Sequence, residues 1–260
     1  MDEEARGRRG KVYFIGAGPG AVDLVTVRGR RLIDAADCII YAGSLVNKDL
    51  FTGCTAPLHD SSGLNLDEVI ELMAAATEKG GLVARVHTGD PALYGAIGEQ
   101  MARLDELNIV YEIVPGVSSA FAAAAALGVE FTLPEVTQSV IFTRRSGRTA
   151  VPPAESLTGL AAHGATMVIF LSVGMIDAVV AELLEGGYDP DTPAAVVMKA
   201  SWPEQRQIRG TLRTIATQVG EAGITRTALI CVGKAFAEKM TAAPSRLYAR
   251  DFSHGYRSGE

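Results

Sequence analysis

Apolar and polar residues along the chain follow two alternating patterns, one typical of helices and one typical of buried strands. The clearest helix is predicted at 66–79, where apolar side chains recur at intervals of three and four residues: Leu66, Val69, Ile70, Met73 and Ala76. That spacing places them on one face of a helix. Gly80 and Gly81 interrupt the pattern, and the apolar run at 82–86 predicts a strand directly afterwards.

In the first half of the chain this alternation repeats several times. We predict helices at 24–36, 66–79 and 95–107, and strands at 11–17, 37–41, 54–59, 82–86 and 109–114. Strands that alternate with helices form a mostly parallel sheet with helices packed on it. In such a sheet, ligands bind beyond the carboxyl ends of the strands.

The second half alternates less regularly. We predict strands at 136–143, 167–172, 194–199, 205–210 and 228–232, and helices at 154–163, 175–186 and 212–222. No helical pattern separates the strands at 194–199 and 205–210, so this sheet should be mixed. The expected fold class is therefore α/β, with two α/β domains at 1–116 and 117–243 and a polar tail at 244–260.

Four segments at the predicted carboxyl ends of strands are rich in glycine, proline and small polar residues, and should together form the opening of one ligand site: 16–20, 41–44, 88–91 and 115–119. The first segment matches the GxGxx(G/A) spacing of dinucleotide-binding loops through Gly16, Gly18 and Ala21. Two features argue against a dinucleotide. The second strand ends in YAGS, without the acidic residue that would hold a ribose, and Pro19 removes a backbone N–H from the turn. A tight turn without a ligand remains an alternative.

Composition and charge exclude several classes of protein. With 48% hydrophobic and 21% charged residues the chain can bury a substantial core, and its net charge of −6 argues against a general nucleic-acid binder. The three cysteines form no CxxC pair, so a disulfide framework or a zinc site is not expected, and Cys38 and Cys231 should be core residues. No signal peptide is visible, and the apolar stretch 165–176 is too short to span a bilayer. We expect a cytoplasmic protein without a membrane partner.

Four motifs, taken in order, resemble the tetrapyrrole (corrin/porphyrin) methylase family: GAGPGAVDLVTVRG, HTGDPALYGAI, VPGVSSAFAAAAALG and TALICVG. The resemblance runs from about Lys11 to about Lys234. Within the family, YAGSLV at 41–46 and QSVIFTR at 138–144 are most similar to the members that methylate carbon 11 of precorrin-4 in cobalamin biosynthesis.

The resemblance implies S-adenosylmethionine as methyl donor, a tetrapyrrole substrate, a homodimer, and an active site in the trough between the two domains. Carried over by motif, it implies that the donor contacts a set of loop and strand-end residues: Pro19, Thr88, Gly89, Asp90, Leu93, Ser118, Ser119, Leu171, Ser172, Ala200 and Ala228. Relatives often have Gly in place of Thr88 and Ala200, and Thr-Ala in place of the two serines.

Asp90 is the only acidic residue within the four loops, and we expect it to be catalytic. Its charge could hold the donor's ammonium or a pyrrole N–H; alternatively, it caps its own turn. Methyl transfer to a pyrrolic carbon depends on alignment of the reacting atoms, so we expect no metal and no covalent intermediate. The candidates for handling a proton are His87, Tyr94 and Asp90, although His87 at a strand end is also a natural core residue.

The expected substrate carries many carboxylates, which a chain of net charge −6 must meet with locally concentrated cations. Arg144 and Arg145, in the stretch TRRSGR, follow a predicted strand and have the fork geometry that suits carboxylates. A solvated basic turn is the alternative. Tyr41, Ser44 and Tyr94 are further candidates for contact with the substrate.

Several other functions remain open at this point. The chain could methylate a different ring carbon, accept cobalt-precorrin-4, or resemble relatives that methylate a protein or an RNA ribose. It could also bind the donor without turnover. A nucleotide-binding oxidoreductase that uses NAD is disfavoured by the missing acidic residue.

Overall fold

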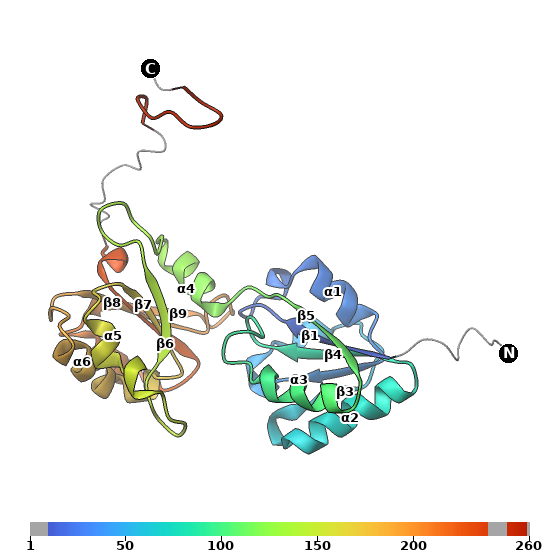
Figure 1. Ribbon diagram of the computed structural model, residues 1–260. Helices are drawn as coiled ribbons and strands as arrows, with labels where there is room; N and C mark the ends of the chain where they lie inside the picture. The colour runs from blue at the N-terminus through green and yellow to red at the C-terminus, as the bar shows by residue number, and fades with distance from the viewer. Residues whose placement is uncertain (1–9, 239–248, 259–260) are drawn as a thin grey trace. The chain divides into compact units, whose positions relative to one another are not determined.

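The computed structural model describes residues 10–238 and 249–258. They form two compact units (Figure 1). Of the described residues, the first unit contains 10–122 together with Ala200–Glu204, and the second contains Ala123–Lys199 and those from Gln205 on. The tail expected at 244–260 lies partly outside the described residues.

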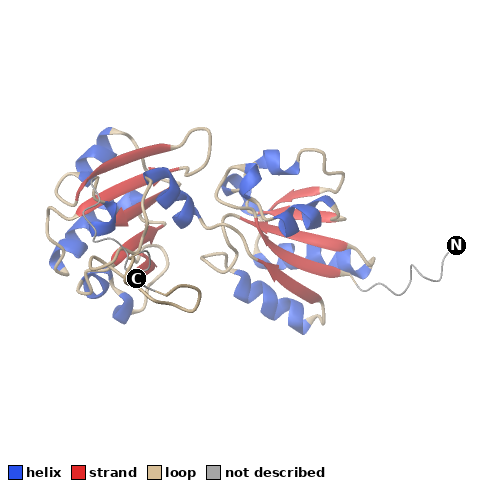
Figure 2. Cartoon of the chain, turned by 90° about the horizontal axis from the view of Figure 1, so that it is seen from above, coloured by secondary structure: helices blue, strands red, loops and turns tan. Residues whose placement is uncertain are grey.

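The first unit is a five-stranded sheet with helices on both faces (Figures 1 and 2). The strand order is β3-β2-β4-β1-β5, and every neighbouring pair is parallel, as predicted. The strands are β1 (Lys11–Gly16), β2 (Cys38–Tyr41), β3 (Leu58–Asp60), β4 (Leu82–His87) and β5 (Val110–Val114). Helix α1 (Val27–Asp34) packs on one face, while α2 (Leu66–Glu78) and α3 (Ile97–Glu106) pack on the other.

Helix α2 shows how local sequence sets the boundaries of these elements. Asn65 caps its start: the Asn65 side chain accepts from the Glu68 backbone N–H (3.1 Å), and the Glu68 carboxylate accepts from the Asn65 N–H (2.7 Å). Its apolar stripe packs Val69, Ile70 and Met73 against the sheet. The helix ends before Gly80, which adopts the left-handed conformation (φ +77°) that favours glycine.

The second unit contains a mixed five-stranded sheet of order β6-β7-β10-β8-β9. Only β6 and β7 pair in parallel, and β8–β9 is an antiparallel pair, as the missing helix between them predicted. The strands are β6 (Val140–Arg144), β7 (Thr166–Phe170), β8 (Pro193–Met198), β9 (Arg206–Thr211) and β10 (Ala228–Val232). Helices α5 (Leu157–Ala161), α6 (Ile176–Glu185) and α7 (Ile215–Glu221) pack their apolar side chains with one face of this sheet.

Helix α4 (Ser119–Leu127) is absent from the elements predicted from the sequence. Its sequence, SAFAAAAAL, consists almost entirely of alanine and other apolar residues, so it has no polar face and no period to detect. Alanine has the highest helix propensity, and this composition was the available signal. The chain leaves the first unit within this helix, after Ala122.

The two cysteines expected in the core, Cys38 in β2 and Cys231 in β10, are buried. Burial raises the pKa of the Cys231 thiol to about 12. Burial and the nearby charge of Asp37 also raise the pKa of the Cys38 thiol. Both thiols therefore remain protonated near neutral pH, which is consistent with a packing role.

Candidate functional site

The loops after β1, β4 and β5 meet at the carboxyl edge of the parallel sheet. Gly18 and Gly89 form an antiparallel bridge, in which the Gly89 N–H donates to the Gly18 carbonyl (2.8 Å) and the Gly18 N–H donates to the Gly89 carbonyl (3.3 Å). Gly16 and Gly116 lie so close that a Cβ on either one would overlap the other's backbone. Three of the four segments predicted to form the opening of one ligand site are thus in direct contact.

The backbone of the glycine-rich loop is largely occupied by contacts within the protein. The N–H groups of Ala17, Gly18 and Ala21 donate to the His87 carbonyl (2.8 Å), the Gly89 carbonyl (3.3 Å) and the Ser201 hydroxyl (3.1 Å). Pro19 has no N–H. A pyrophosphate is held by several free N–H groups at a helix N-terminus or loop, and this loop does not offer them. The geometry therefore supports the sequence argument against a dinucleotide.

Asp90 connects two of the loops through its carboxylate. One oxygen, Oδ1, accepts from the Ala92 N–H (2.8 Å), and the other, Oδ2, accepts from the Gly116 N–H (2.9 Å). Asp90 is half-buried, so these contacts to its charge are stronger than exposed neutral ones. The first contact is the turn-capping alternative, and the second was not foreseen. The catalytic role expected for Asp90 remains a prediction.

Other donor-site candidates of the first unit lie in the same loops as Asp90. The Leu93 N–H donates to the Asp90 carbonyl (3.2 Å), and Thr88 is half-buried directly after β4. The Cα of Ser118 and the N of Ser119 each lie 3.6 Å from the position that a Cβ on Gly89 would occupy. The structure therefore brings Pro19, Thr88, Gly89, Asp90, Leu93, Ser118 and Ser119 to one edge of the sheet.

The candidates for substrate contact in this unit differ in exposure. Tyr41 is 6% exposed, packs against Phe51 with ring centroids 5.2 Å apart, and carries the Lys48 ammonium 5.6 Å from its ring centroid. Tyr94 is 43% exposed and has a left-handed backbone (φ +58°), which is unusual for an aromatic residue. Ser44 belongs to the turn Gly43–Leu45, but its side chain lies outside the described part of the chain.

In the second unit, the donor-site candidates Leu171 and Ser172 follow β7. Leu171 is 68% exposed and has a left-handed backbone (φ +55°), which costs free energy in a branched residue. Ser172 is fully buried, and its hydroxyl accepts from the Arg145 N–H (2.9 Å) and donates to the Phe170 carbonyl (2.7 Å). Ala228 is the buried first residue of β10.

Arg144 and Arg145 have partners within the second unit. The Arg144 guanidinium donates to the carbonyls of Thr149 (2.9 Å) and Ala150 (2.7 Å), so it braces its own turn. Arg145 forms an ion pair with Glu182 of α6 at 2.7 Å. The basic turn is therefore more ordered than a solvated charge run, and any ligand would have to share these side chains with their present partners.

His87 and Arg85 form a buried polar pair on one face of β4. His87 is 3% exposed and its Nε2 has no hydrogen-bond partner. Arg85 donates to the Gln100 side-chain oxygen (3.0 Å) and to the Ser61 hydroxyl (2.9 Å). Burial, aided by the charge of Arg85, lowers the pKa of His87 to about 3, and burial lowers the pKa of Arg85 to about 10. His87 is thus neutral near pH 7, which removes it as a proton donor there.

Three residues that contact the glycine-rich loop were missed at the sequence level: Asn47, Ser201 and Trp202. Ala200, a donor-site candidate, is buried at the start of the same segment and belongs to the first unit. Trp202 and Pro19 are 183 positions apart in the chain. No local pattern indicates such a contact.

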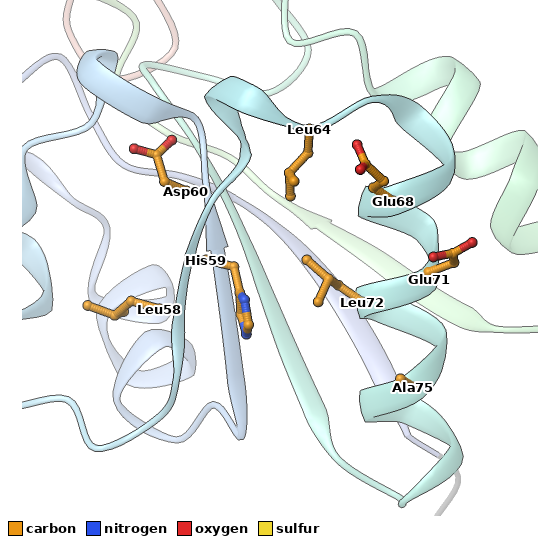
Figure 3. A pocket seen from close by; sticks show the side chains of 8 residues that line it. All are labelled: Leu58, His59, Asp60, Leu64, Glu68, Glu71, Leu72 and Ala75. Atoms are coloured by element: carbon orange, nitrogen blue, oxygen red, sulfur yellow. The ribbon is translucent and has the colours of Figure 1, made fainter.

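A groove of about 600 Å³ lies between β3 and α2 in the first unit (Figure 3). Asp60, Glu68 and Glu71 line it together with His59 and apolar side chains. These carboxylates would repel a polycarboxylate ligand. The groove also contains none of the candidate site residues, so it is a poor candidate for the substrate site.

Neither a metal-binding cluster nor a membrane-spanning helix is found among the described residues. Among them, no group of three or more His, Cys, Asp and Glu side chains is arranged to hold a metal ion. No helix in the same part of the chain is long and apolar enough to cross a membrane.

Comparison with known proteins adds independent evidence. A family model for tetrapyrrole (corrin/porphyrin) methylases matches residues 11–216. The chain is 52% identical to a cobalt-precorrin-4 C(11)-methyltransferase from Methanocaldococcus jannaschii, over 95% of this chain and 96% of the relative. It is 51% identical to a precorrin-4 C(11)-methyltransferase from Pseudomonas aeruginosa, over 96% of this chain and 99% of the relative.

Two solved structures are also similar. The X-ray structure of a cobalt precorrin-4 methyltransferase matches with a TM-score of 0.85 and 45% identity, covering 87% of this chain and 96% of that chain. A uroporphyrin-III C-methyl transferase from Thermus thermophilus in complex with S-adenosyl homocysteine matches with a TM-score of 0.75 and 26% identity, covering 86% of this chain and 98% of that chain.

The burial of His87 predicts a specific pH dependence of stability. The folded state keeps His87 neutral down to about pH 3, whereas an unfolded histidine takes up a proton near pH 6.5. The unfolded state therefore binds more protons between these values, and the free energy of unfolding should fall as the pH is lowered from 6.5. This one group contributes at most about 1.4 kcal/mol per pH unit.

Urea unfolding at pH 7, 6 and 5 measures this effect. The variant His87→Gln should lose part of the slope between pH 6.5 and 5, whereas His163→Gln, at an exposed position, is the matched control. If His87→Gln has the same slope as the unmodified chain, His87 is not held neutral by the fold.

Proposed function

Because the chain belongs to the tetrapyrrole (corrin/porphyrin) methylases, we propose that it transfers a methyl group from S-adenosylmethionine to carbon 11 of precorrin-4 in cobalamin biosynthesis. The observation that carries the proposal is the identity of about half of all positions, over nearly the full length, with methyltransferases named for that reaction. The strand-end loops of the first unit agree with it.

The glycine-rich loop suits a donor without phosphate. S-adenosylmethionine supplies a methyl group on a cationic sulfur and carries no phosphate, so it needs no cradle of free N–H groups. The contacts of Ala17, Gly18 and Ala21 hold the loop rigid, and a rigid loop can hold the donor in one orientation. Good alignment of reacting groups is worth up to about 7–11 kcal/mol of the barrier.

The donor-site set is carried forward as part of the proposal. In the first unit Pro19, Gly89, Asp90 and Ser118 would contact the donor, and the Asp90 charge would attract its cationic part while the same carboxylate holds Gly116. Leu171, the exposed leucine with a strained backbone, is the strongest candidate of the second unit. Strain of this kind is concentrated at functional sites.

The form of the substrate is an open part of the proposal, because one of the two relatives is named for cobalt-precorrin-4 and the other for precorrin-4. The homodimer, the cytoplasmic location, the site between the two domains and the absence of a catalytic metal remain predictions. The oxidoreductase alternative is disfavoured by the occupied N–H groups of the glycine-rich loop.

The product of the reaction tests the proposed function. Incubation with ¹³C-methyl-labelled S-adenosylmethionine and either precorrin-4 or cobalt-precorrin-4 should give one new labelled methyl group, assigned to carbon 11 by NMR. The form of the substrate that turns over faster identifies the pathway. A label on another ring carbon would contradict the proposed position, and turnover of neither form would contradict the proposed substrate. Calorimetry with NAD serves as the control for the oxidoreductase alternative.

The basic turn gives a second test. If Arg144 and Arg145 bind substrate carboxylates, replacing both by Ala should raise the KM for the tetrapyrrole by tens-fold or more, since each charge-assisted contact is worth about 1.5–3 kcal/mol. The Kd of the donor should hardly change. Steady-state kinetics and calorimetry measure the two effects.

Glu182→Gln is the matched control for this test, because it removes the present partner of Arg145 and leaves the arginine in place. It should leave the tetrapyrrole KM unchanged or lower it. An equal rise in KM for Glu182→Gln and for the double variant would assign the arginines to the scaffold of the second unit.

A further inference from the structure

Trp202 is the only tryptophan of the chain, and it lies against the glycine-rich loop. Its indole Nε1–H donates to the Pro19 carbonyl (2.8 Å). The segment 200–204 follows β8 and precedes β9 in the chain, yet it packs with the first unit. A residue remote in sequence thus contacts the position at which the donor is expected.

Two further side chains hold the same stretch of backbone. The Ser201 hydroxyl accepts from the Ala21 N–H (3.1 Å), and the Asn47 side-chain N–H donates to the Gly20 carbonyl (3.0 Å). Three consecutive residues, Pro19 to Ala21, therefore each have a backbone polar group bound by a side chain from elsewhere. A loop held at every residue has little freedom to change its conformation.

The indole also packs directly on the loop. A Cβ on Gly20 would overlap the Trp202 ring, and the backbone of Gly20 is in the region that favours glycine (φ +157°). Glycine at this position therefore leaves room for the ring against the backbone. Trp202 is half-buried in this arrangement.

The chain between β8 and β9 adopts an unfavourable backbone conformation where it makes these contacts. Lys199 and Ser201 both have left-handed conformations (φ +47° and +68°), which cost free energy in residues other than glycine. Such conformations persist only where surrounding contacts compensate for them. At Ser201, the hydrogen bond with Ala21 is one such contact.

We propose that Trp202 and Ser201 are positioning residues for the methyl donor: they hold Pro19, Gly20 and Ala21 in the conformation that binds it. The inference rests on the proposed function, because it assumes that the donor lies against this loop. It assigns the segment 200–204 a role in the affinity for the donor and none in the affinity for the tetrapyrrole.

The first experiment uses Trp202 as a fluorescent reporter. Because the chain has a single tryptophan, its emission reports on the environment of this loop alone. Titration of the unmodified protein with S-adenosylhomocysteine should change the intensity or wavelength of the emission, with a midpoint equal to the Kd measured by calorimetry. Binding by calorimetry without any change in emission would overturn the inference.

The second experiment removes the indole N–H while keeping an aromatic ring. Trp202→Phe should raise the Kd of S-adenosylhomocysteine by about 3- to 10-fold, the range for one net hydrogen bond. Trp202→Ala, which also removes the packing on Gly20, should raise it further. In both variants the KM for the donor should rise, while the KM for the tetrapyrrole stays unchanged.

Tyr111→Phe is the matched control, because it removes one side-chain hydrogen bond, to Asp105, from the same unit. It should leave the donor Kd unchanged. If Trp202→Phe weakens donor and tetrapyrrole equally, or binds the donor as well as the unmodified chain does, the inference is wrong. If Trp202→Ala fails to fold, Trp202→Phe decides.

The outcome separates this inference from the proposed function. If the unmodified protein binds no S-adenosylhomocysteine, the proposed function itself fails. If it binds the donor product and turns over the tetrapyrrole, but the Trp202 variants behave like the control, only the positioning role fails.

Discussion

The close approach of three loops at one edge of a parallel sheet is the constraint on which the rest of the candidate site depends. Gly16 and Gly116 leave no room for a side chain between them, and Gly18 pairs with Gly89 through two backbone hydrogen bonds. Because the strands are parallel, their carboxyl ends lie at one edge of the sheet, and small residues allow the loops to touch there. The Asp90 carboxylate then joins the loop after β4 to the loop after β5.

This arrangement leaves the glycine-rich loop with few free backbone N–H groups. Once Ala17, Gly18 and Ala21 have donated their N–H groups to protein acceptors, the loop has lost the anion-binding capacity of a dinucleotide site. A loop that binds a dinucleotide and a loop that binds a donor without phosphate therefore differ in how many of their backbone N–H groups are free. The GxGxx(G/A) spacing alone does not distinguish the two. The Asp90 carboxylate holds the scaffold through Gly116, and its proposed second role is to present the same charge to a cationic ligand.

Much of the fold follows from local patterns in the sequence. The apolar stripe of α2, the glycines that follow it and the missing helix between β8 and β9 are all short-range features, and each gave the correct element, boundary or pairing. Helix α4 escaped because a uniformly apolar, alanine-rich segment has no periodicity. The strand expected at 54–59 is shorter and later, at Leu58–Asp60, because it pairs with β2 only over those residues.

The candidate site was less predictable, because its contacts join residues that are far apart in sequence. The hydrogen bond from Trp202 to Pro19 and the ion pair between Arg145 and Glu182 depend on how remote segments pack. The low pKa of His87 likewise follows from burial beside Arg85, which a sequence pattern does not reveal. The motifs predicted which loops belong to the candidate site. Three-dimensional packing determines which polar groups of these loops already have hydrogen-bond partners within the protein.

A crystal structure of the protein with S-adenosylhomocysteine tests the central claim most directly, namely that the strand-end loops of the first unit bind the methyl donor. We expect electron density for the ligand in contact with Pro19, the turn 88–90 and Ser118, with the hydrogen bonds of Pro19, Gly20 and Ala21 retained. Density in the acidic groove between β3 and α2, or elsewhere away from these loops, would contradict it.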